Sequence, residues 1–217
     1  MIDWSGVDHV LLDMYGTLLD LRYDNTFWLE HLPRVYGERQ GLSLAAAQDF
    51  ILAQTRRHLG TIRFYCMDFW SDTLGLDVAA LNAELAHLIC MRPYVPEFLD
   101  AMRLAGKRTV LVTNAHRSGL EFKLDQTGLA ARLDAIVCAH DLGEPKEEQA
   151  FWQALQRVEP FDAARSVLVD DNLAVLEAAR RYGVGHLLAV TQPDSSRPPH
   201  EVQAFLRLEC FSHLLPD

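Results

Sequence analysis

The decisive stretch of the sequence is HVLLDMYGTL, residues 9–18. It joins a short apolar run, His9–Leu12, to a polar turn that begins at Asp13 and contains Gly16. A continuous apolar run of this length is typical of a strand that is covered on both faces, as in a parallel sheet. Because the run stops where the carboxylate begins, we expect Asp13 at the carboxyl edge of such a sheet.

Four more apolar runs of strand length occur further along the chain: Arg108–Val112, Ala135–Ala139, Ser166–Val169 and His186–Val190. Between the later runs, apolar residues recur with helical spacing, and Gly128 and Gly183 are suited to helix ends. This alternation of strand and helix predicts an α/β fold, a doubly wound parallel sheet with right-handed crossovers. After a loop rich in Pro and Ser at 192–200 we expect a short final helix.

Residues 20–92 show a different pattern. Ser43 is suited to cap a helix, and the apolar residues of another helical face run through Leu81–Ile89. No strand signal of comparable strength lies in this stretch. We therefore predict an all-helical insertion at 20–92 and an α/β core domain formed by 1–19 and 93–217.

The composition restricts the class of protein. The chain has 217 residues and a formal net charge of −10, from 30 acidic and 20 basic residues, which argues against a nucleic-acid partner. Four scattered cysteines without metal-finger spacing indicate free thiols in a reducing compartment. We see no signal peptide and no apolar run long enough to span a membrane, and so expect a cytoplasmic protein without a membrane partner. The sequence leaves the oligomeric state open.

Polar residues whose side chains could bind a ligand or take part in catalysis follow the predicted strands. Open α/β sheets bind ligands at the carboxyl ends of their strands, near the point where the strand order reverses. The residues expected at this edge are one aspartate after the first run, two polar residues after the second, a lysine in the loop after the third and an aspartate pair after the fourth: Asp13, Thr113, Asn114, Lys146, Asp170 and Asp171.

This set of side chains is suited to phosphoryl transfer. Asp13 can attack phosphorus and form an aspartyl-phosphate, and Asp13 with Asp170 offers hard oxygen ligands to Mg²⁺. Thr113 can donate a hydrogen bond to a phosphoryl oxygen, and Lys146 adds positive charge. Asp171 would orient water on the metal ion or pair with Lys146. Each residue alone could be a turn or helix-cap residue, but their combination at separate strand ends favours a catalytic site.

The four segments resemble motifs I to IV of the haloacid dehalogenase-like superfamily, which read DxxGT, T/S, K and DD, and the helical insertion resembles its C1 cap. The resemblance implies a hydrolase whose nucleophile is Asp13. It also implies a phosphate site and a magnesium site. The phosphate-binding residues would be Gly16, Thr113, Asn114 and Lys146, and the magnesium ligands would come from Asp13, the backbone carbonyl of Tyr15, Asp170 and Asp171.

Beyond these motifs the chain is similar along nearly its whole length to bacterial GMP/IMP 5′-nucleotidases of the superfamily. The similar stretches include Phe27-Trp28, Thr113–His116, Pro145–Gln149 and Thr191–Asp194. The similarity implies a small phosphorylated metabolite as substrate, with GMP or IMP as examples.

Tyr15 departs from the pattern of phosphatases in this superfamily. They read DxDGT, and the second aspartate acts as general acid and base, whereas position 15 here is a phenol with an ordinary pKa near 10. True 2-haloacid dehalogenases read DxYGT and need no metal, so dehalogenation is an alternative. Against it, Asp170 and Asp171 stand where dehalogenases typically have Ser and Asn, Val175 falls near a further aspartate of theirs, and Trp152 replaces their tyrosine. A non-catalytic protein that binds nucleotide or metal is a third hypothesis.

The predicted cap contains side chains able to stack on a purine or to bind a phosphate. The candidates are Arg22, Phe27, Trp28, Arg56, Arg57, His58, Arg63, Tyr65, Phe69 and Trp70. For any single one of them we favour the simpler interpretation, in which the aromatic rings form the core of the insertion and the arginines face solvent. Hinges near Asp20 and Pro93 would let the insertion open and close.

Overall fold

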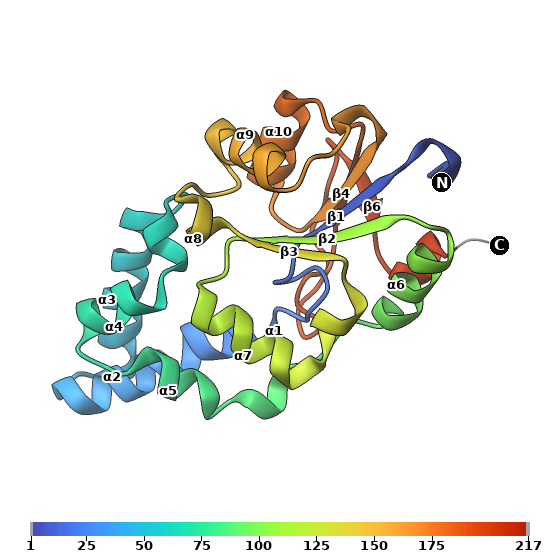
Figure 1. Ribbon diagram of the computed structural model, residues 1–217. Helices are drawn as coiled ribbons and strands as arrows, with labels where there is room; N and C mark the ends of the chain where they lie inside the picture. The colour runs from blue at the N-terminus through green and yellow to red at the C-terminus, as the bar shows by residue number, and fades with distance from the viewer. Residues whose placement is uncertain (1, 216–217) are drawn as a thin grey trace.

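The protein is built around a parallel sheet. The computed structural model describes residues 2–215, and its sheet has the strand order β3-β2-β1-β4-β5-β6, with all neighbours parallel (Figure 1). The strands are β1 (His9–Leu12), β2 (Arg108–Thr113), β3 (Ala135–Cys138), β4 (Ser166–Asp170), β5 (His186–Val190) and β6 (Leu206–Leu208). The five strands predicted from the sequence are confirmed, and their ends agree to within one residue.

The sixth strand was not predicted. The sequence analysis expected a short final helix after the Pro-rich loop, and this is wrong for residues 206–208, which pair with β5 so that Leu206 lies opposite Leu188. Only Leu208 of this edge strand is buried, so it lacks the continuous apolar run that marks the inner strands. A single 3₁₀ turn follows at Phe211–Leu214, where the rings of Phe211 and Phe98 are 5.1 Å apart.

Helices connect the strands and form the insertion. The α-helices are α1 (Arg22–Thr26), α2 (Leu32–Gln40), α3 (Leu44–His58), α4 (Met67–Leu74), α5 (Val78–Ala83), α6 (Val95–Leu104), α7 (Arg117–Thr127), α8 (Ala139–Leu142), α9 (Gln149–Val158) and α10 (Leu173–Tyr182). A π-helical turn joins α1 to α2. The expected helix stops are confirmed, because Gly128 and Gly183 end α7 and α10 in the left-handed conformation that glycine adopts without strain.

Each face of the sheet is covered by its own set of helices. Figure 1 shows α9 and α10 on one side of the sheet and α6 and α7 on the other. Phe151 and Leu176 belong to the first apolar cluster, and Phe98 and Leu120 to the second. Burial of each such side chain stabilises the fold by roughly 1.5–3 kcal/mol. The double cover explains why the inner strands are apolar on both faces.

The π-helical turn and helices α2 to α5 form a third apolar cluster of their own, in which Phe27, Ile51, Trp70 and Leu74 are buried. We call residues 20–92 the helical segment. Its α3 begins as predicted, because the Ser43 hydroxyl accepts a hydrogen bond from the backbone N–H of Ala46 at 3.3 Å. In Figure 1, α2 to α5 lie together on the left, far from α6.

The two connections through which the chain enters and leaves the helical segment lie side by side. The N–H of Asp20 donates to the carbonyl of Cys90 at 3.0 Å, and the N–H of Arg92 donates to the carbonyl of Leu18 at 2.9 Å. The guanidinium of Arg92 also donates to the carbonyl of Pro193 at 3.1 Å. The two connections are therefore hydrogen-bonded to each other and, through Arg92, to the loop that follows β5.

A buried ion pair joins the helical segment to α7. The Lys123 ammonium lies 2.6 Å from an Asp24 carboxylate oxygen, and only 3% of the lysine side chain is exposed. The same ammonium lies over two aromatic rings, 3.5 Å from the centroid of Tyr15 and 4.5 Å from that of Tyr23. The two ring faces and the carboxylate replace the water that Lys123 loses on burial.

We expect Lys123→Met to lower the free energy of unfolding by about 3–5 kcal/mol, because it leaves the Asp24 carboxylate buried without its partner. Urea unfolding of the purified protein would measure this change. The double variant Asp24→Asn/Lys123→Met removes both charges and is expected to regain most of the loss. Equal stability of the single variant and the wild type would show that Asp24 finds another partner.

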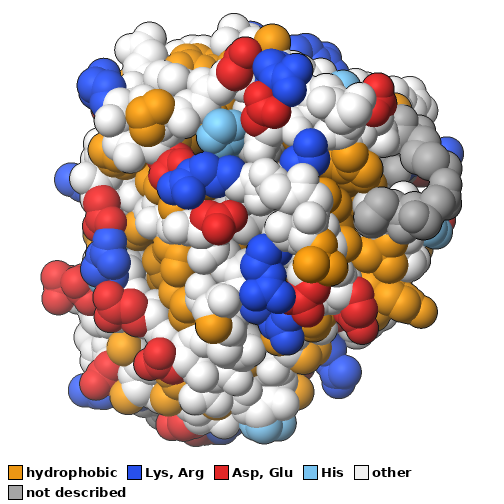
Figure 2. Space-filling model, turned by 45° about the vertical axis from the view of Figure 1, so that its right-hand side comes forward, with side chains coloured by type: hydrophobic (Ala, Val, Ile, Leu, Met, Phe, Trp, Pro, Cys, Tyr) orange, Lys and Arg blue, Asp and Glu red, His pale blue; other side chains and the backbone are white. Residues whose placement is uncertain are grey.

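The surface carries both signs of charge. On the face drawn in Figure 2, Lys and Arg side chains are interspersed with Asp and Glu side chains. Among residues 2–215, we find no helix with the length and apolarity required to cross a membrane.

Candidate active site

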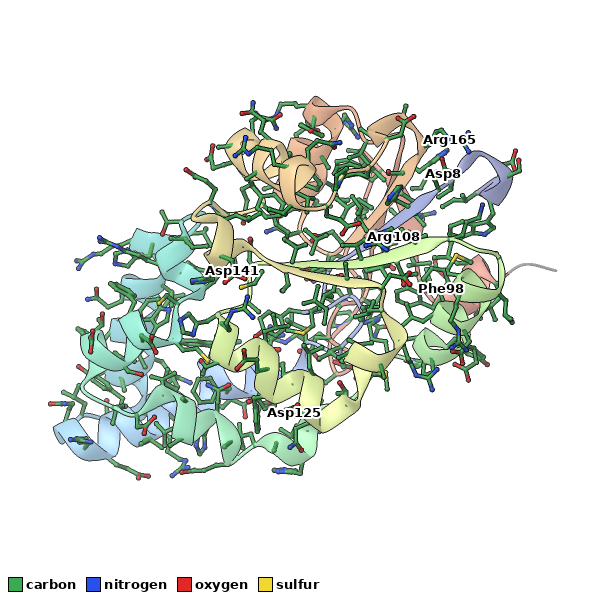
Figure 3. The ribbon with its side chains drawn as sticks, in the orientation of Figure 1. Asp8, Phe98, Arg108, Asp125, Asp141 and Arg165 are labelled. Carbon is green, nitrogen blue, oxygen red and sulfur yellow. The ribbon has the colours of Figure 1, made fainter. Side chains whose placement is uncertain are left out.

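The carboxyl ends of β1 and β4 lie at the point where the strand order reverses. The chain runs from β1 to β2 and β3 on one side, and β4 lies on the other side of β1. Asp13 directly follows β1, its N–H donates to the carbonyl of Val169 at 3.0 Å, and Asp170 is the last residue of β4. At the opposite, amino ends of these strands, Figure 3 shows Asp8 beside Arg165, a pair joined at 2.5 Å.

Three carboxylates meet at the carboxyl end. One oxygen each from Asp13, Asp170 and Asp171 lies within 4.8 Å of the others. The ammonium of Lys146 lies between two of them, 2.5 Å from Asp13 Oδ1 and 2.7 Å from Asp170 Oδ2. Lys146 is 2% exposed, so this contact excludes water. The predicted convergence of these four residues is confirmed as geometry.

The site holds more negative than positive charge. Burial raises the pKa of Asp13, and burial followed by the charge of the neighbouring carboxylate raises the pKa of Asp171 well above its ordinary value. Burial alone would lower the pKa of Lys146, but attraction to Asp13 and Asp170 outweighs it, and the pKa is raised. One lysine therefore faces three acids that resist ionisation together, which is the electrostatic environment that a bound cation relieves.

Asn114 orients the lysine. Its side-chain oxygen accepts a hydrogen bond from the backbone N–H of Lys146 at 2.9 Å, and its amide group donates to Glu147 at 2.9 Å. The carbonyl of Lys146 accepts from the indole N–H of Trp152, also at 2.9 Å. The proposed phosphate-binding amide of Asn114 is thus engaged with protein groups, although Asn114 does border the cavity described below.

Thr113 lies at the end of β2 and is fully buried. Its hydroxyl oxygen accepts a hydrogen bond from the N–H of Ala115 at 3.1 Å, which leaves the hydroxyl proton available for donation. Its contact with a phosphoryl group stays a prediction.

Gly16 leaves room for the Asp171 carboxylate to lie close to the backbone of the turn after β1. Its φ angle is +71°, in the left-handed region, and a Cβ atom there would lie 2.6 Å from Asp171 Oδ2 and 2.7 Å from Pro193 Cβ. Any larger residue would displace Asp171, so the glycine of motif I has a packing role in addition to any role toward phosphate.

Tyr15 has the aromatic ring over which Lys123 lies. Burial first, and the charge of Asp24 next, raise the pKa of its phenol well above the ordinary value. The hydroxyl is directed toward Gly119 of α7, where a Cβ would lie 3.4 Å from it. Among the described residues we find no hydrogen bond to this hydroxyl. A phenol in this state stays protonated at neutral pH and is a weaker acid than an ordinary tyrosine, so it supplies neither a proton nor a phenolate base readily.

A cavity of about 470 Å³ opens over the carboxylates, within the range of roughly 300–1,000 Å³ that is usual for small-molecule sites. Asp13, Lys146 and Asp170 form its floor, and residues of the helical segment form much of its wall. The aromatic residues of that wall are Trp28, Phe64, Tyr65 and Trp70.

The candidates in the helical segment divide into two groups. Trp28, Tyr65 and Trp70 line the cavity, but Trp70, like Phe27, is also buried in the segment's own cluster. The remaining candidates, Arg22, Arg56, Arg57, His58, Arg63 and Phe69, are not among the described residues that line the cavity. The simpler interpretation holds for the arginines, for Phe27 and for the buried Trp70, but not for Trp28 and Tyr65.

The sequence analysis missed Glu147, which connects several parts of the site. Its carboxylate accepts hydrogen bonds from the Tyr65 hydroxyl at 2.7 Å, from Asn114 at 2.9 Å and from Asn172 at 3.2 Å. Its position directly after Lys146 was the only available signal. Glu147 ties the helical segment to the loops after β2 and β4.

Comparison with known proteins identifies the family. Residues 7–183 match the family of haloacid dehalogenase-like hydrolases, and the chain belongs to this family and is a hydrolase. The chain is 39% identical over 215 residues to the GMP/IMP nucleotidase YrfG of Escherichia coli K12, a match that covers 99% of this chain and 97% of the relative. The Shigella flexneri protein of the same name matches to the same extent.

Solved structures share the fold. A HAD phosphatase from Thermococcus onnurineus has a TM-score of 0.80 at 18% identity, with 96% of each chain covered. The L-2-haloacid dehalogenase from Xanthobacter autotrophicus has a TM-score of 0.66 at 17% identity, again with 96% of each chain covered. At these identities the likeness concerns the fold alone, and it includes both a phosphatase and a dehalogenase.

Proposed function

We propose that the protein is a Mg²⁺-dependent phosphomonoesterase that acts on purine nucleoside 5′-monophosphates. The observation that carries this proposal is the cluster of Asp13, Asp170 and Asp171 beside Lys146 on the floor of one cavity. A metal-independent reaction has no evident use for three such carboxylates. The similarity to a GMP/IMP nucleotidase along 99% of the chain supports the choice of substrate.

Asp13 is the proposed nucleophile. A carboxylate oxygen of Asp13 forms a bond to phosphorus while the bond from phosphorus to the nucleoside 5′-oxygen breaks. The departing alkoxide takes its proton from water, since the phenol of Tyr15 is a poor acid and base. Water then hydrolyses the aspartyl-phosphate, which returns the Asp13 carboxylate and releases inorganic phosphate. Lys146 holds Asp13 in place and offers positive charge to the phosphoryl oxygens.

The residues present fit a magnesium ion. Hard carboxylate oxygens are the ligands that Mg²⁺ selects, and Asp13, Asp170 and the backbone carbonyl of Tyr15 would hold it, with Asp171 close by. When bound, the ion would neutralise the phosphoryl oxygens and lessen their repulsion by the Asp13 carboxylate.

The helical segment would act as the cap of this enzyme, residues 20–92, over a core of residues 1–19 and 93–217. Among its cavity aromatics, the half-buried Trp28 is suited to stack on a purine ring. The paired connections at Leu19 and Met91, which form an antiparallel bridge, are the natural place for a hinge.

Phosphate release from GMP and IMP tests the proposal. With excess Mg²⁺ we expect slow release, which a chelator reduces to the background rate and which added Mg²⁺ restores. Ribose 5-phosphate, which lacks the base, is the matched control and is expected to be a poorer substrate. Release that is unchanged by the chelator, or no release from either nucleotide, would contradict the proposal.

Tyr15 favours a second candidate, a 2-haloacid dehalogenase, because halide leaves without a proton. In that reaction the Asp13 carboxylate displaces chloride from carbon, and water hydrolyses the resulting ester. Chloride release from 2-chloropropionate in the presence of a chelator would support it. The absence of chloride release with and without metal would remove it.

A further inference from the structure

A second cluster of potential metal ligands lies outside the carboxylate site. One ligand atom each from Cys66, His116 and His140 lies within 4.8 Å of the others. Cys66 precedes α4 in the helical segment, His116 precedes α7, and His140 lies in α8 after β3. None of the three has a part in the proposed phosphatase reaction.

The ring of His140 has a nitrogen without a partner. Its Nε2 atom is buried, and no hydrogen-bond partner for it exists among the described residues. A buried polar atom without a partner destabilises the fold, so it favours a ligand that satisfies it. A neutral imidazole with a free lone pair is the form that binds metal ions.

The ring of His116 has a hydrogen-bond partner at Nδ1. Its Nδ1 lies 2.9 Å from the Ser118 hydroxyl, which in turn donates to the Met67 sulfur at 3.7 Å. In the tautomer in which the Ser118 oxygen accepts the Nδ1 proton, the lone pair of the ring is on Nε2. Such a second hydrogen bond commonly fixes a metal-binding histidine. The Nε2 atom lies 3.6 Å from an oxygen of Asp68, an exposed side chain that is free to approach.

An exposed ion pair keeps the two histidine-bearing elements together. The guanidinium of Arg117, the residue after His116, donates through Nε to Asp141 Oδ1 at 3.1 Å. Figure 3 shows Asp141 in α8, at the end of the sheet that faces the helical segment. The rings of His116 and His140 have centroids 4.9 Å apart and meet edge to face.

We propose that Cys66, His116 and His140 bind one Zn²⁺ ion, with Asp68 or a water molecule as the fourth ligand. A thiolate and two imidazoles form a donor set that zinc prefers and magnesium does not. Zinc bond lengths of about 2.3 Å to sulfur and about 2.0–2.1 Å to nitrogen place tetrahedral ligands about 3.5 Å apart. The three side chains would therefore move inward by about 1 Å, which rotation of half-buried side chains allows.

A bound ion would link the helical segment to the residues that follow β2 and β3. Cys66 comes from the helical segment, His116 from the loop after β2, and His140 from α8, which directly follows β3. Met67, next to Cys66, lines the cavity, so the ion would hold that wall near the carboxylates. Zinc would thus favour the arrangement of the segment that the structure shows, whether or not the protein is a phosphatase.

Cobalt substitution tests the site on the full-length protein with excess Mg²⁺ present. We expect one Co²⁺ per chain, with the absorption band of a thiolate-to-cobalt charge transfer, and competition by Zn²⁺. Cys66→Ser should remove the band and weaken Zn²⁺ binding at least about 100-fold, because even outer-shell changes cost about 10–100-fold. Serine keeps the helix cap that Cys66 supplies to the N–H of Phe69, so α4 should still form.

Two further variants complete the test. Cys210→Ser changes a thiol of similar burial and is expected to leave the band intact. His140→Ala should weaken Zn²⁺ binding as Cys66→Ser does. The proposal would be overturned by a wild type without the band or by a band that persists in Cys66→Ser. Zinc binding that is lost in Asp170→Asn but kept in Cys66→Ser would also overturn it, because the ion would then sit on the carboxylates.

Discussion

Asp13→Asn is expected to reduce phosphate release from GMP by at least about 10³-fold, because no other described group occupies the position of the nucleophile. An amide nitrogen or oxygen does not attack phosphorus, and the neutral side chain also binds a cation more weakly. The variant should fold, since the asparagine oxygen can still accept a hydrogen bond from Lys146, and thermal unfolding would verify this.

Because we expect slow phosphate release by the wild type, a loss of this size is measured best in a variant that turns over faster. We therefore expect the same loss when Asp13→Asn is introduced into the Tyr15→Asp protein described next. Glu148→Gln, at an exposed position close in sequence to Lys146, is a control that changes one carboxylate outside the site. Phosphate release by Asp13→Asn within a factor of ten of its parent would mean that another group carries out the attack.

Tyr15→Asp is expected to raise the turnover of nucleoside monophosphates by about 10²–10⁴-fold, the usual contribution of a positioned general acid and base. The wild-type phenol has a pKa raised by burial and by Asp24, so it neither protonates the alkoxide nor activates water. Steady-state phosphate release with Mg²⁺ measures the effect. Trapping of the aspartyl-phosphate by acid quench should show more intermediate in the wild type than in the variant.

Tyr15→Phe is the matched control for this substitution. It keeps the ring over which the Lys123 ammonium lies and removes only the hydroxyl, so we expect turnover equal to that of the wild type. Tyr15→Asp turnover no higher than wild type would contradict the assigned defect. A large loss in Tyr15→Phe would instead show that the phenol takes part in the reaction.

Much of the fold could be predicted from the sequence, because doubly covered strands leave a continuous apolar signal. His9–Leu12 and Ser166–Asp170 are examples, and the polar residues that follow them marked the site. Strand β6 could not be predicted, since an edge strand of three residues buries a single side chain and lacks this signal.

The parts of the site that depend on tertiary contacts were not predictable. Lys123 is a charged residue on the otherwise apolar face of the helix that ends at Gly128, and its partners in the fold are Asp24 and the ring of Tyr15. Cys66 and His140 are 74 positions apart (140 − 66) and carry no local spacing that suggests a metal site. Such clusters arise only when separate loops meet at one edge of the sheet.

A crystal structure with Mg²⁺ and beryllium trifluoride, a mimic of the phosphoryl group, tests the central claim most directly. We predict one magnesium ion bound by Asp13 and Asp170, with the mimic attached to Asp13 and within reach of Lys146. Asp13 and Asp170 that remain paired with Lys146, without ion or mimic in the cavity, would contradict the account.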